Sequence, residues 1–309
     1  MTVLVRDIRP GVRADTEGFC MARRLALPHL LATPESVVHD LTHQRPGAHY
    51  RLLVAEVDGE IVGTAETGLS LDSPEPGHGY LNVYVRPDRT RQGAGSLLLR
   101  TAEEHLASAG AAKAFVWVLD RPEHRAFAAR HGYTPSRSGH FLRLDLTDGA
   151  LPPLPPLPPG VTLRTGADYA DDPRPLFALD AEVTSDEPGD ITAELTDYPA
   201  WLAETWQHPL LNHTLTTVVL VDGEPAAFSA AYTDGTGRYG SAMTGTARAH
   251  RGRGLARLAK TDSLLRARAA GCTEAITGND SGNEPMLAIN KAFGYTICAT
   301  EVRHVRTLG

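Results

Sequence analysis

The chain repeats itself on either side of a proline-rich segment, residues 150–160, which reads Ala-Leu-Pro-Pro-Leu-Pro-Pro-Leu-Pro-Pro-Gly. Proline at this density cannot continue a helix or a sheet ladder and favours the extended polyproline II conformation. We therefore expect a semi-rigid spacer between two domains, residues 1–149 and 161–309. A ligand for an SH3 domain is the alternative interpretation, but the mid-chain position favours the spacer.

Four short motifs recur across the spacer at offsets of 161 to 164 positions. The pairs are Val57-Asp-Gly-Glu60 with Val221-Asp-Gly-Glu224, Gly93-Ala-Gly95 with Gly254-Leu-Ala256, Gly110 with Gly271, and His131-Gly-Tyr133 with Phe293-Gly-Tyr295. Because four independent motifs keep nearly one spacing, chance is a poor explanation. The two halves are predicted to be copies of one fold.

Each copy has the same order of predicted elements. Asp-Gly between two β-rich runs is the signature of a hairpin. A strand and a helical stretch precede it, and a third strand follows and runs into a glycine-containing turn. The remaining predicted segments, in the first and second copy, are a helix (96–109; 257–270), a β run (114–119; 275–277), a shorter helix ending at Gly132 or Gly294, and a closing strand (141–146; 300–305). This order predicts an α/β fold with a mixed sheet and helices on its faces.

Composition excludes several classes of function. The chain has 309 residues, a net charge of −7 and no basic stripe, so nucleic acid is a poor partner. No apolar run reaches the roughly 18 residues of a membrane helix, and the N-terminus lacks the pattern of a signal peptide. Three cysteines without metal-ligand spacing indicate buried reduced thiols and no metal. We expect a cytoplasmic enzyme that is a monomer or a homodimer.

The second copy contains a turn suited to an anion. Met243-Thr-Gly-Thr-Ala-Arg-Ala-His-Arg-Gly-Arg-Gly-Leu-Ala256 runs from a predicted strand into a helix. Glycines let a backbone approach its ligand closely, and the free N–H groups at a helix start favour a phosphate. Arg251 and Arg253 add charge-assisted contacts to the same anion.

Arg251-Gly-Arg-Gly-Leu-Ala256 resembles the Gln/Arg-x-x-Gly-x-Gly/Ala motif of the GNAT acetyltransferase superfamily. The resemblance covers both halves and implies two GNAT folds in tandem, each with a centrally splayed sheet. It implies that acetyl-CoA is the co-substrate and that the strand before the turn pairs with pantetheine. The cofactor-binding residues implied on this basis are Thr244, Gly245, Thr246, Arg251, Gly252, Arg253, Gly254, Leu255 and Ala256.

The second half also resembles the mycothiol synthase-like tandem branch, through the segment from Thr277 to Tyr295. This resemblance puts Asn279 and Asn283 at the mouth of the splay, where their amides would bind pantetheine or the phosphates. A helix cap ahead of Pro285 is the alternative role of the second asparagine, and the two roles are compatible.

The sequence departs from the family pattern in two places. Many GNATs carry a tyrosine, the general acid for the departing thiolate, at the slot occupied here by Asn290 and, in the first copy, by Ala128. We therefore assign Asn290 to substrate binding. Thr90 replaces the motif arginine in the first copy, which we interpret as degenerate or structural. A second cofactor site there would comprise Val83, Val85, Arg91, Gln92, Gly93, Ala94 and Gly95.

The acceptor side is predicted from its charge. Seven carboxylates lie at residues 180–197, within the segment between the first strand and the hairpin of the second copy, and a Pro-Gly turn presents Asp186, Glu187 and Asp190 as a loop. Carboxylates can attract an ammonium group and accept its proton, so these three are the catalytic candidates. Tyr232 and Tyr239 are predicted substrate contacts. A solvated acidic loop and core aromatics are the structural alternatives.

These patterns predict an acetyl-CoA-dependent N-acetyltransferase. The acetyl group would pass directly to a primary amine of a small molecule in a ternary complex, without an acyl-enzyme. Transfer to a protein or peptide amine is one alternative. A non-catalytic acyl-CoA-binding module is another, suggested by the missing tyrosine.

Overall fold

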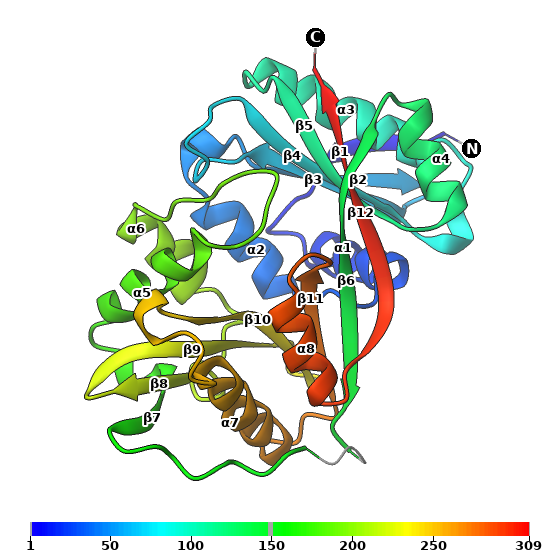
Figure 1. The fold of residues 1–309 in the computed structure, drawn as a ribbon. Helices are drawn as coiled ribbons and strands as arrows, with labels where there is room; N and C mark the ends of the chain where they lie inside the picture. Colours follow the sequence, from blue (N-terminus) through cyan, green and yellow to red (C-terminus); the bar gives the residue numbers. More distant parts are fainter. Residues whose placement is uncertain (1, 148–150, 309) are drawn as a thin grey trace. The chain divides into compact units, whose positions relative to one another are not determined.

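The structure is a computed structural model that describes residues 2–147 and 151–308. The chain divides into two compact units. The first unit consists of residues 1–138 together with 301–309, and the second unit of residues 139–300 (Figure 1). Among the described residues, no helix is both long and apolar enough to cross a membrane.

The first unit is a mixed sheet with the strand order β1-β2-β3-β4-β5-β12. Its neighbouring strands are antiparallel except for β4 and β5, which are parallel. The strands are β1 (Leu4–Asp7), β2 (Arg51–Val57), β3 (Glu60–Leu69), β4 (His78–Val85), β5 (Lys113–Leu119) and the 301–307 part of β12 (Thr296–Thr307). The helices are α1 (Arg13–Ala26), α2 (Pro34–His43), α3 (Ala94–Ser108) and α4 (Pro122–Arg130).

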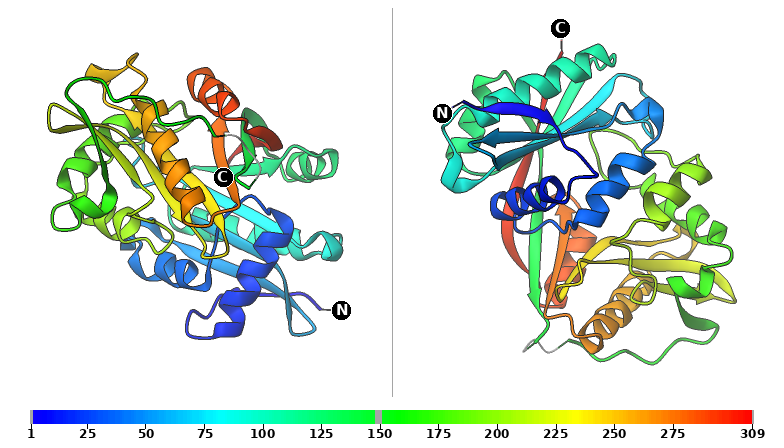
Figure 2. Two further views of the ribbon diagram at one scale, coloured as in Figure 1. Left: turned by 90° about the horizontal axis from the view of Figure 1, so that it is seen from below. Right: turned by 180° about the vertical axis from the view of Figure 1, so that it is seen from behind.

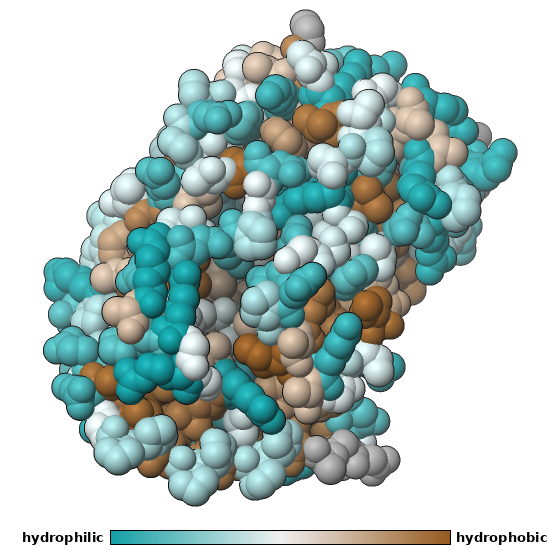
Figure 3. Space-filling view, viewed as in Figure 1, coloured by the Kyte–Doolittle hydropathy of each residue, from teal (hydrophilic) through white to brown (hydrophobic). Residues whose placement is uncertain are grey.

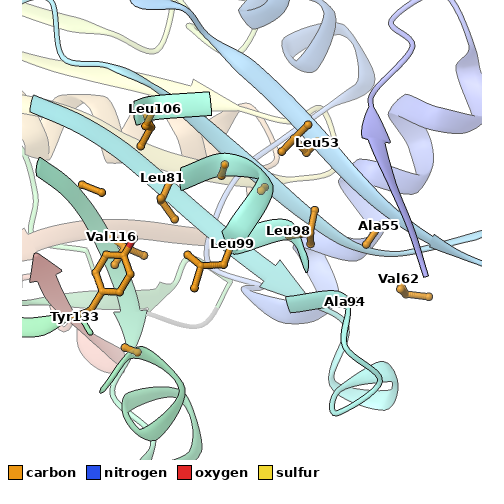
Figure 4. Packing of buried hydrophobic residues seen from close by; sticks show 14 of the residues in the cluster. Leu53, Ala55, Val62, Leu81, Ala94, Leu98, Leu99, Leu106, Val116 and Tyr133 are labelled. Atoms are coloured by element: carbon orange, nitrogen blue, oxygen red, sulfur yellow. The ribbon is translucent and has the colours of Figure 1, made fainter. Parts of the chain in front are cut away.

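Alternating residues of β2 explain why helices cover both faces of this sheet. Leu53 packs in the core formed with α3, where Leu98 and Leu106 are fully buried (Figure 4). Leu52 points to the opposite face and packs with Phe19 of α1. Figure 2 shows the helices on the two faces from further directions.

The second unit repeats this plan with the order β6-β11-β10-β9-β8-β7. Only β10 and β11 are parallel neighbours. The strands are the 139–145 part of β6 (Thr134–Asp145), β7 (Val161–Thr165), β8 (Thr217–Val221), β9 (Glu224–Thr233), β10 (Arg238–Thr246) and β11 (Glu274–Asp280). The helices are α5 (Arg174–Thr184), α6 (Tyr198–Trp201), α7 (Leu255–Ala269) and α8 (Glu284–Ala292). The predicted fold class, two mixed sheets flanked by helices, is confirmed.

Both predicted hairpins form, with the same backbone at the turn. Asp58 and Gly59 have φ of 51° and 83°, and Asp222 and Gly223 have 52° and 92°. Two successive positive φ values are those of a type I′ turn, which matches the twist of the flanking strands. The Asp-Gly pair thus fixes each hairpin locally.

The closing strands differ from the sequence expectation, in which each copy ends on its own strand. The sheet of the first unit ends on β12, where Glu301 to Thr307 pair with Leu119 to Lys113 of β5. The sheet of the second unit ends on β6, where Gly139 to Asp145 pair with Asp280 to Glu274 of β11. The unit boundaries therefore differ from the expected division at residues 149 and 161. Either strand offers the same backbone ladder to its neighbour, so local sequence does not decide which one closes which sheet.

The proline-rich segment and the cysteines complete the fold. Residues 151–158 contain no helix or strand, in keeping with their proline content. No disulfide joins the three cysteines, all of which lie in the described part of the chain. Cys272 is buried as expected, whereas Cys20 is half-buried and Cys298 is exposed, so the expectation of burial is wrong for Cys298 and holds only in part for Cys20.

Candidate cofactor and acceptor site

The two parallel strands of the second unit separate part-way along their length. β10 and β11 pair from Arg238 and Glu274 as far as Ser241 and Thr277, and no further pair joins the described residues of these strands. A register shift between Ser241 and Met243 against β9 marks a bulge at the same point. Residues 242–246 therefore turn one backbone edge toward the opening, where an extended amide chain can pair with it.

The glycine-rich turn follows directly. Gly252 and Gly254 have φ of 74° and 75°, and Gly254 is the N-cap of α7. A Cβ at either position would meet nothing within 4 Å, so the positive φ, not crowding, favours glycine there. Gly254 has no side chain to cap the helix, so the first N–H groups of α7 remain available to an anion.

The motif arginine is held by two partners. Arg251 Nε donates to the carbonyl oxygen of Thr246 at 3.2 Å, and its Nη2 lies 2.5 Å from Asp186 Oδ2. Arg253 Nη1 lies 3.0 Å from Nδ1 of His250. Both guanidinium groups therefore lie at the turn, and their predicted contact with an anion stays a prediction. Figure 3 shows hydrophilic side chains over α5 on this face of the molecule.

Asp186 lies in the loop after α5, and its carboxylate is bound to two arginines of the glycine-rich turn. Hydrogen bonds from Arg248 and Arg251 lower the pKa of its carboxyl to about 2. A carboxylate of such low basicity is poorly suited to accept a proton from an amine near neutral pH. This corrects the predicted role of Asp186 as a proton acceptor. The 186–190 loop itself follows α5 as expected, so Glu187 and Asp190 remain acceptor candidates.

The three asparagines form one local arrangement. Asn283 caps α8, accepting from the backbone N–H of Met286 at 3.3 Å, so the cap role is confirmed. Asn290 on α8 is fully buried and donates through Nδ2 to Oδ1 of Asn279 on β11. Burial corrects the prediction that Asn290 contacts substrate. Its hydrogen bond instead orients Asn279, which lies beside the opening between β10 and β11.

The two tyrosines have different environments. Tyr239 is fully buried, and its hydroxyl lies 2.7 Å from Oγ of Ser263. It is a core residue, which corrects its prediction as a substrate contact. Tyr232 on β9 is half-buried and stacks on His208, with ring centroids 5.3 Å apart. Tyr232 therefore stays a predicted contact.

The corresponding opening in the first unit is bridged by a side chain. β4 and β5 pair only from His78 and Lys113 to Tyr80 and Phe115 in the described ladder. Beyond that point Asn82 Oδ1 accepts from the backbone N–H of Trp117 at 3.0 Å. The β3–β4 register runs without a shift, so this copy lacks the bulge.

The turn of the first unit nevertheless has the same backbone shape. Arg91 and Gly93 have φ of 63° and 92°, at the positions of Gly252 and Gly254. Gly93 is the N-cap of α3, and Ala94 is buried at the helix start. The other residues assigned to this second site are Val83, Val85, Gln92 and Gly95, of which both valines pack against the core.

Two buried charges escaped the sequence analysis. Lys260 on α7 is fully buried, no described residue accepts a hydrogen bond from its Nζ, and the ammonium lies 5.1 Å from the ring centroid of Tyr295. Glu301 on β12 is 7% exposed, and its Oε1 has no hydrogen-bond partner among the described residues. Burial lowers the pKa of Lys260 to about 7 and raises that of Glu301 to about 7. No sequence signal singled them out, because other charged residues, such as Asp262 in α7 and Arg303 in β12, stand close by.

Part of the chain matches the model of a known protein family. Residues 23–133 match the model of the acetyltransferase (GNAT) family. This segment lies in the first unit, whereas the sequence motif favoured the second copy as the competent one.

Three relatives are each named mycothiol acetyltransferase. The protein from Nocardia farcinica is 36% identical over 167 residues, 52% of this chain and 50% of that protein. The one from Tsukamurella paurometabola is 39% identical over 124 residues, 40% of each chain. The one from a Nocardioides species is 26% identical, over 70% of this chain and 76% of that protein. The chain thus spans half the length, or less, of the first two relatives.

Two solved structures share the fold over nearly their whole length. A tandem GNAT protein from the clavulanic acid biosynthesis pathway has a TM-score of 0.73 at 20% identity, covering 100% of this chain and 99% of that one. A GCN5-related N-acetyltransferase from Sphaerobacter thermophilus has a TM-score of 0.71 at 19% identity, covering 99% and 96%. At these identities the likeness concerns the fold.

Proposed function

We propose that the chain is a tandem member of the GNAT acetyltransferase family and that its second unit transfers the acetyl group of acetyl-CoA to a primary amine of a small molecule. The neutral amine nitrogen attacks the thioester carbonyl in a ternary complex, the C–S bond breaks, and CoA leaves as its thiolate. The proton that the nitrogen loses passes to water or to the departing thiolate. No acyl-enzyme forms.

The observation that carries this proposal is the adjacency of the strand opening and the anion turn. The unpaired edge of β10 at residues 242–246 leads into Gly252 and Gly254 at the start of α7. An extended pantetheine arm would pair with the strand edge, while the pyrophosphate lies on the N–H groups of the helix. One rigid segment therefore serves both ends of the cofactor, which aligns the thioester.

The acceptor is proposed to enter beside the C-terminal end of α5. Glu187 and Asp190 on the 186–190 loop supply negative charge that attracts an ammonium group, and Tyr232 offers a ring and a hydroxyl. The names of the relatives suggest an acceptor related to mycothiol, so a cysteinyl-amino sugar belongs among the first amines to test.

A thiol-release assay tests the function. The full chain is mixed with acetyl-CoA and a panel of amines comprising cysteinyl-amino sugars, aminoglycosides, polyamines and peptides, and free CoA is measured. Saturable release with a small amine, abolished when the amine is N-methylated to a quaternary cation, supports the proposal. CoA binding without release for any amine would leave only a cofactor-binding module.

A further inference from the structure

A cluster of charged side chains joins the end of α5 to the anion turn within the second unit. Arg248 Nε lies 2.7 Å from Asp186 Oδ2, and its Nη2 lies 2.8 Å from Oδ1. The same Nη2 lies 2.7 Å from Oγ of Ser185, and the backbone N–H of Arg248 donates to Oε1 of Glu182 at 2.6 Å. With the contact from Arg251, both oxygens of Asp186 have guanidinium partners. These hydrogen bonds attach the C-terminal end of α5 to the start of the glycine-rich turn that precedes α7.

These contacts fix the orientation of Arg251. A guanidinium carries five N–H donors in one plane, so binding Nε and Nη2 sets the direction of all the others. Nε is bound to the carbonyl of Thr246 and Nη2 to Asp186. Arg251 is 46% exposed, so its other donors can reach a ligand in the turn.

The first unit has no counterpart to this link among its described contacts. Thr90 occupies the slot of Arg251, and its hydroxyl donates to the carbonyl of Pro87 at 3.3 Å. Arg89 pairs with Glu60 of β3 at 2.7 Å rather than with the helix before the hairpin. The link is therefore a property of the second copy alone.

We propose that Asp186 is a positioning residue that orients Arg251 and Arg248 toward the CoA pyrophosphate and couples cofactor binding to the acceptor loop at residues 186–190. The proposal rests on the function proposed above. Asp186 does not touch the reacting atoms. It acts through the two arginines on one side and through its own place in the loop on the other, so cofactor affinity and amine KM depend on the same carboxylate.

A double-mutant cycle on the full chain tests this inference. CoA affinity is measured by calorimetry for the wild type, Asp186→Asn, Arg251→Gln and the double variant. Asp186→Asn should weaken CoA binding by about tenfold, because the amide keeps the shape but loses the charge that holds the guanidinium. In the Arg251→Gln background the same change should have an effect of about twofold or less. Asp172→Asn, which alters another exposed Asp–Arg pair of this unit, is the matched control.

The outcomes separate this inference from the function. If Arg251→Gln weakens CoA binding but Asp186→Asn leaves it unchanged or strengthens it, Asp186 is a bystander or a competitor of the phosphate, and only the inference fails. If both single variants weaken binding but their effects add in full, Asp186 does not act through Arg251, and the inference also fails. If the wild-type chain binds no CoA, the proposed function fails first. A rise in amine KM on Asp186→Asn, with kcat nearly constant, is the expected kinetic signature.

Discussion

The two anion turns have one backbone shape built from different residues. Positive φ at two alternate positions comes from Gly252 and Gly254 in the second unit, and from Arg91 and Gly93 in the first. An arginine with φ of 63° is uncommon for a residue with a Cβ, so the fold, rather than the residue, imposes the turn. The turn therefore keeps the same backbone shape in both units, although the residues that form it differ.

The contact between the first helix of each unit and the strand that leads into its anion turn, α1 with β4 and α5 with β10, also differs between the two units. In the first unit Arg23 of α1 lies over Tyr84, 5.5 Å from the ring centroid, while in the second unit Val183 of α5 lies on Gly245, 161 positions after Tyr84. A Cβ on Gly245 would overlap the side chain of Val183. Gly245 thus lets the helix approach the strand, a role in packing that the motif alone did not indicate.

The largest expected effect concerns the buried base of the second unit. Lys260 titrates near pH 7 when folded and near 10.5 when exposed, so the unfolded chain binds more protons in that window and stability rises with pH. Lys260→Met should remove this slope and stabilise the protein by about 3–5 kcal/mol at pH 7. Urea unfolding from pH 7 to 10 measures it, with exposed Lys291→Met as the control. An unchanged slope would mean that the folded chain keeps the ammonium charged.

The buried acid of the first unit should behave in the opposite way. Glu301 has a folded pKa of about 7 against an ordinary 4.5, so the folded chain binds more protons between these values and stability falls as pH rises. Glu301→Gln should flatten this branch and stabilise the protein by about 3 kcal/mol at pH 8. Exposed Glu104→Gln is the control in the same urea experiment. A variant that is less stable at pH 8 would show that the charged carboxylate has a partner.

The two turns should differ in their affinity for acetyl-CoA. Gly254→Asp adds a negative charge and a Cβ at positive φ beside the pyrophosphate, and should weaken binding by about 100-fold. Gly93→Asp should leave the tighter site intact in calorimetry on the full chain. Gly271→Asp, at the opposite end of α7 with φ of 89°, controls for backbone strain. The reverse pattern would move the competent site to the first unit, where the family model matches.

The smallest effect is expected at the slot of the family tyrosine. Asn290 is buried and bonds to Asn279, so Asn290→Ala should lower kcat by less than about tenfold, below the 10²–10⁴-fold typical of a lost general acid. Acetyl transfer is followed by free CoA release, with Ala128→Gly in the first unit as the matched control. A larger fall in kcat at unchanged CoA affinity would place Asn290 in the chemistry.

Local signals explain what the sequence could predict. The Asp58-Gly59 hairpin and the Gly254 turn depend on the φ preferences of a few neighbouring residues. The partner of Asp186 did not follow from the sequence, because Arg248 is 62 residues away and any acidic loop has the same local pattern. The burial of Tyr239 was not predictable either, since strand alternation leaves the identity of the covered face open.

The exchanged closing strands make each half of the chain depend on the other for a complete sheet. Neither half of the chain contains all six strands of one sheet. Residues 301–307, from the second half, complete the first sheet, and residues 139–145, from the first half, complete the second. A deletion of either half would leave the surviving β5 or β11 with an unsatisfied edge until it captured the closing strand of its own repeat. Each copy therefore depends on the other for its closing strand, whichever of them binds the cofactor.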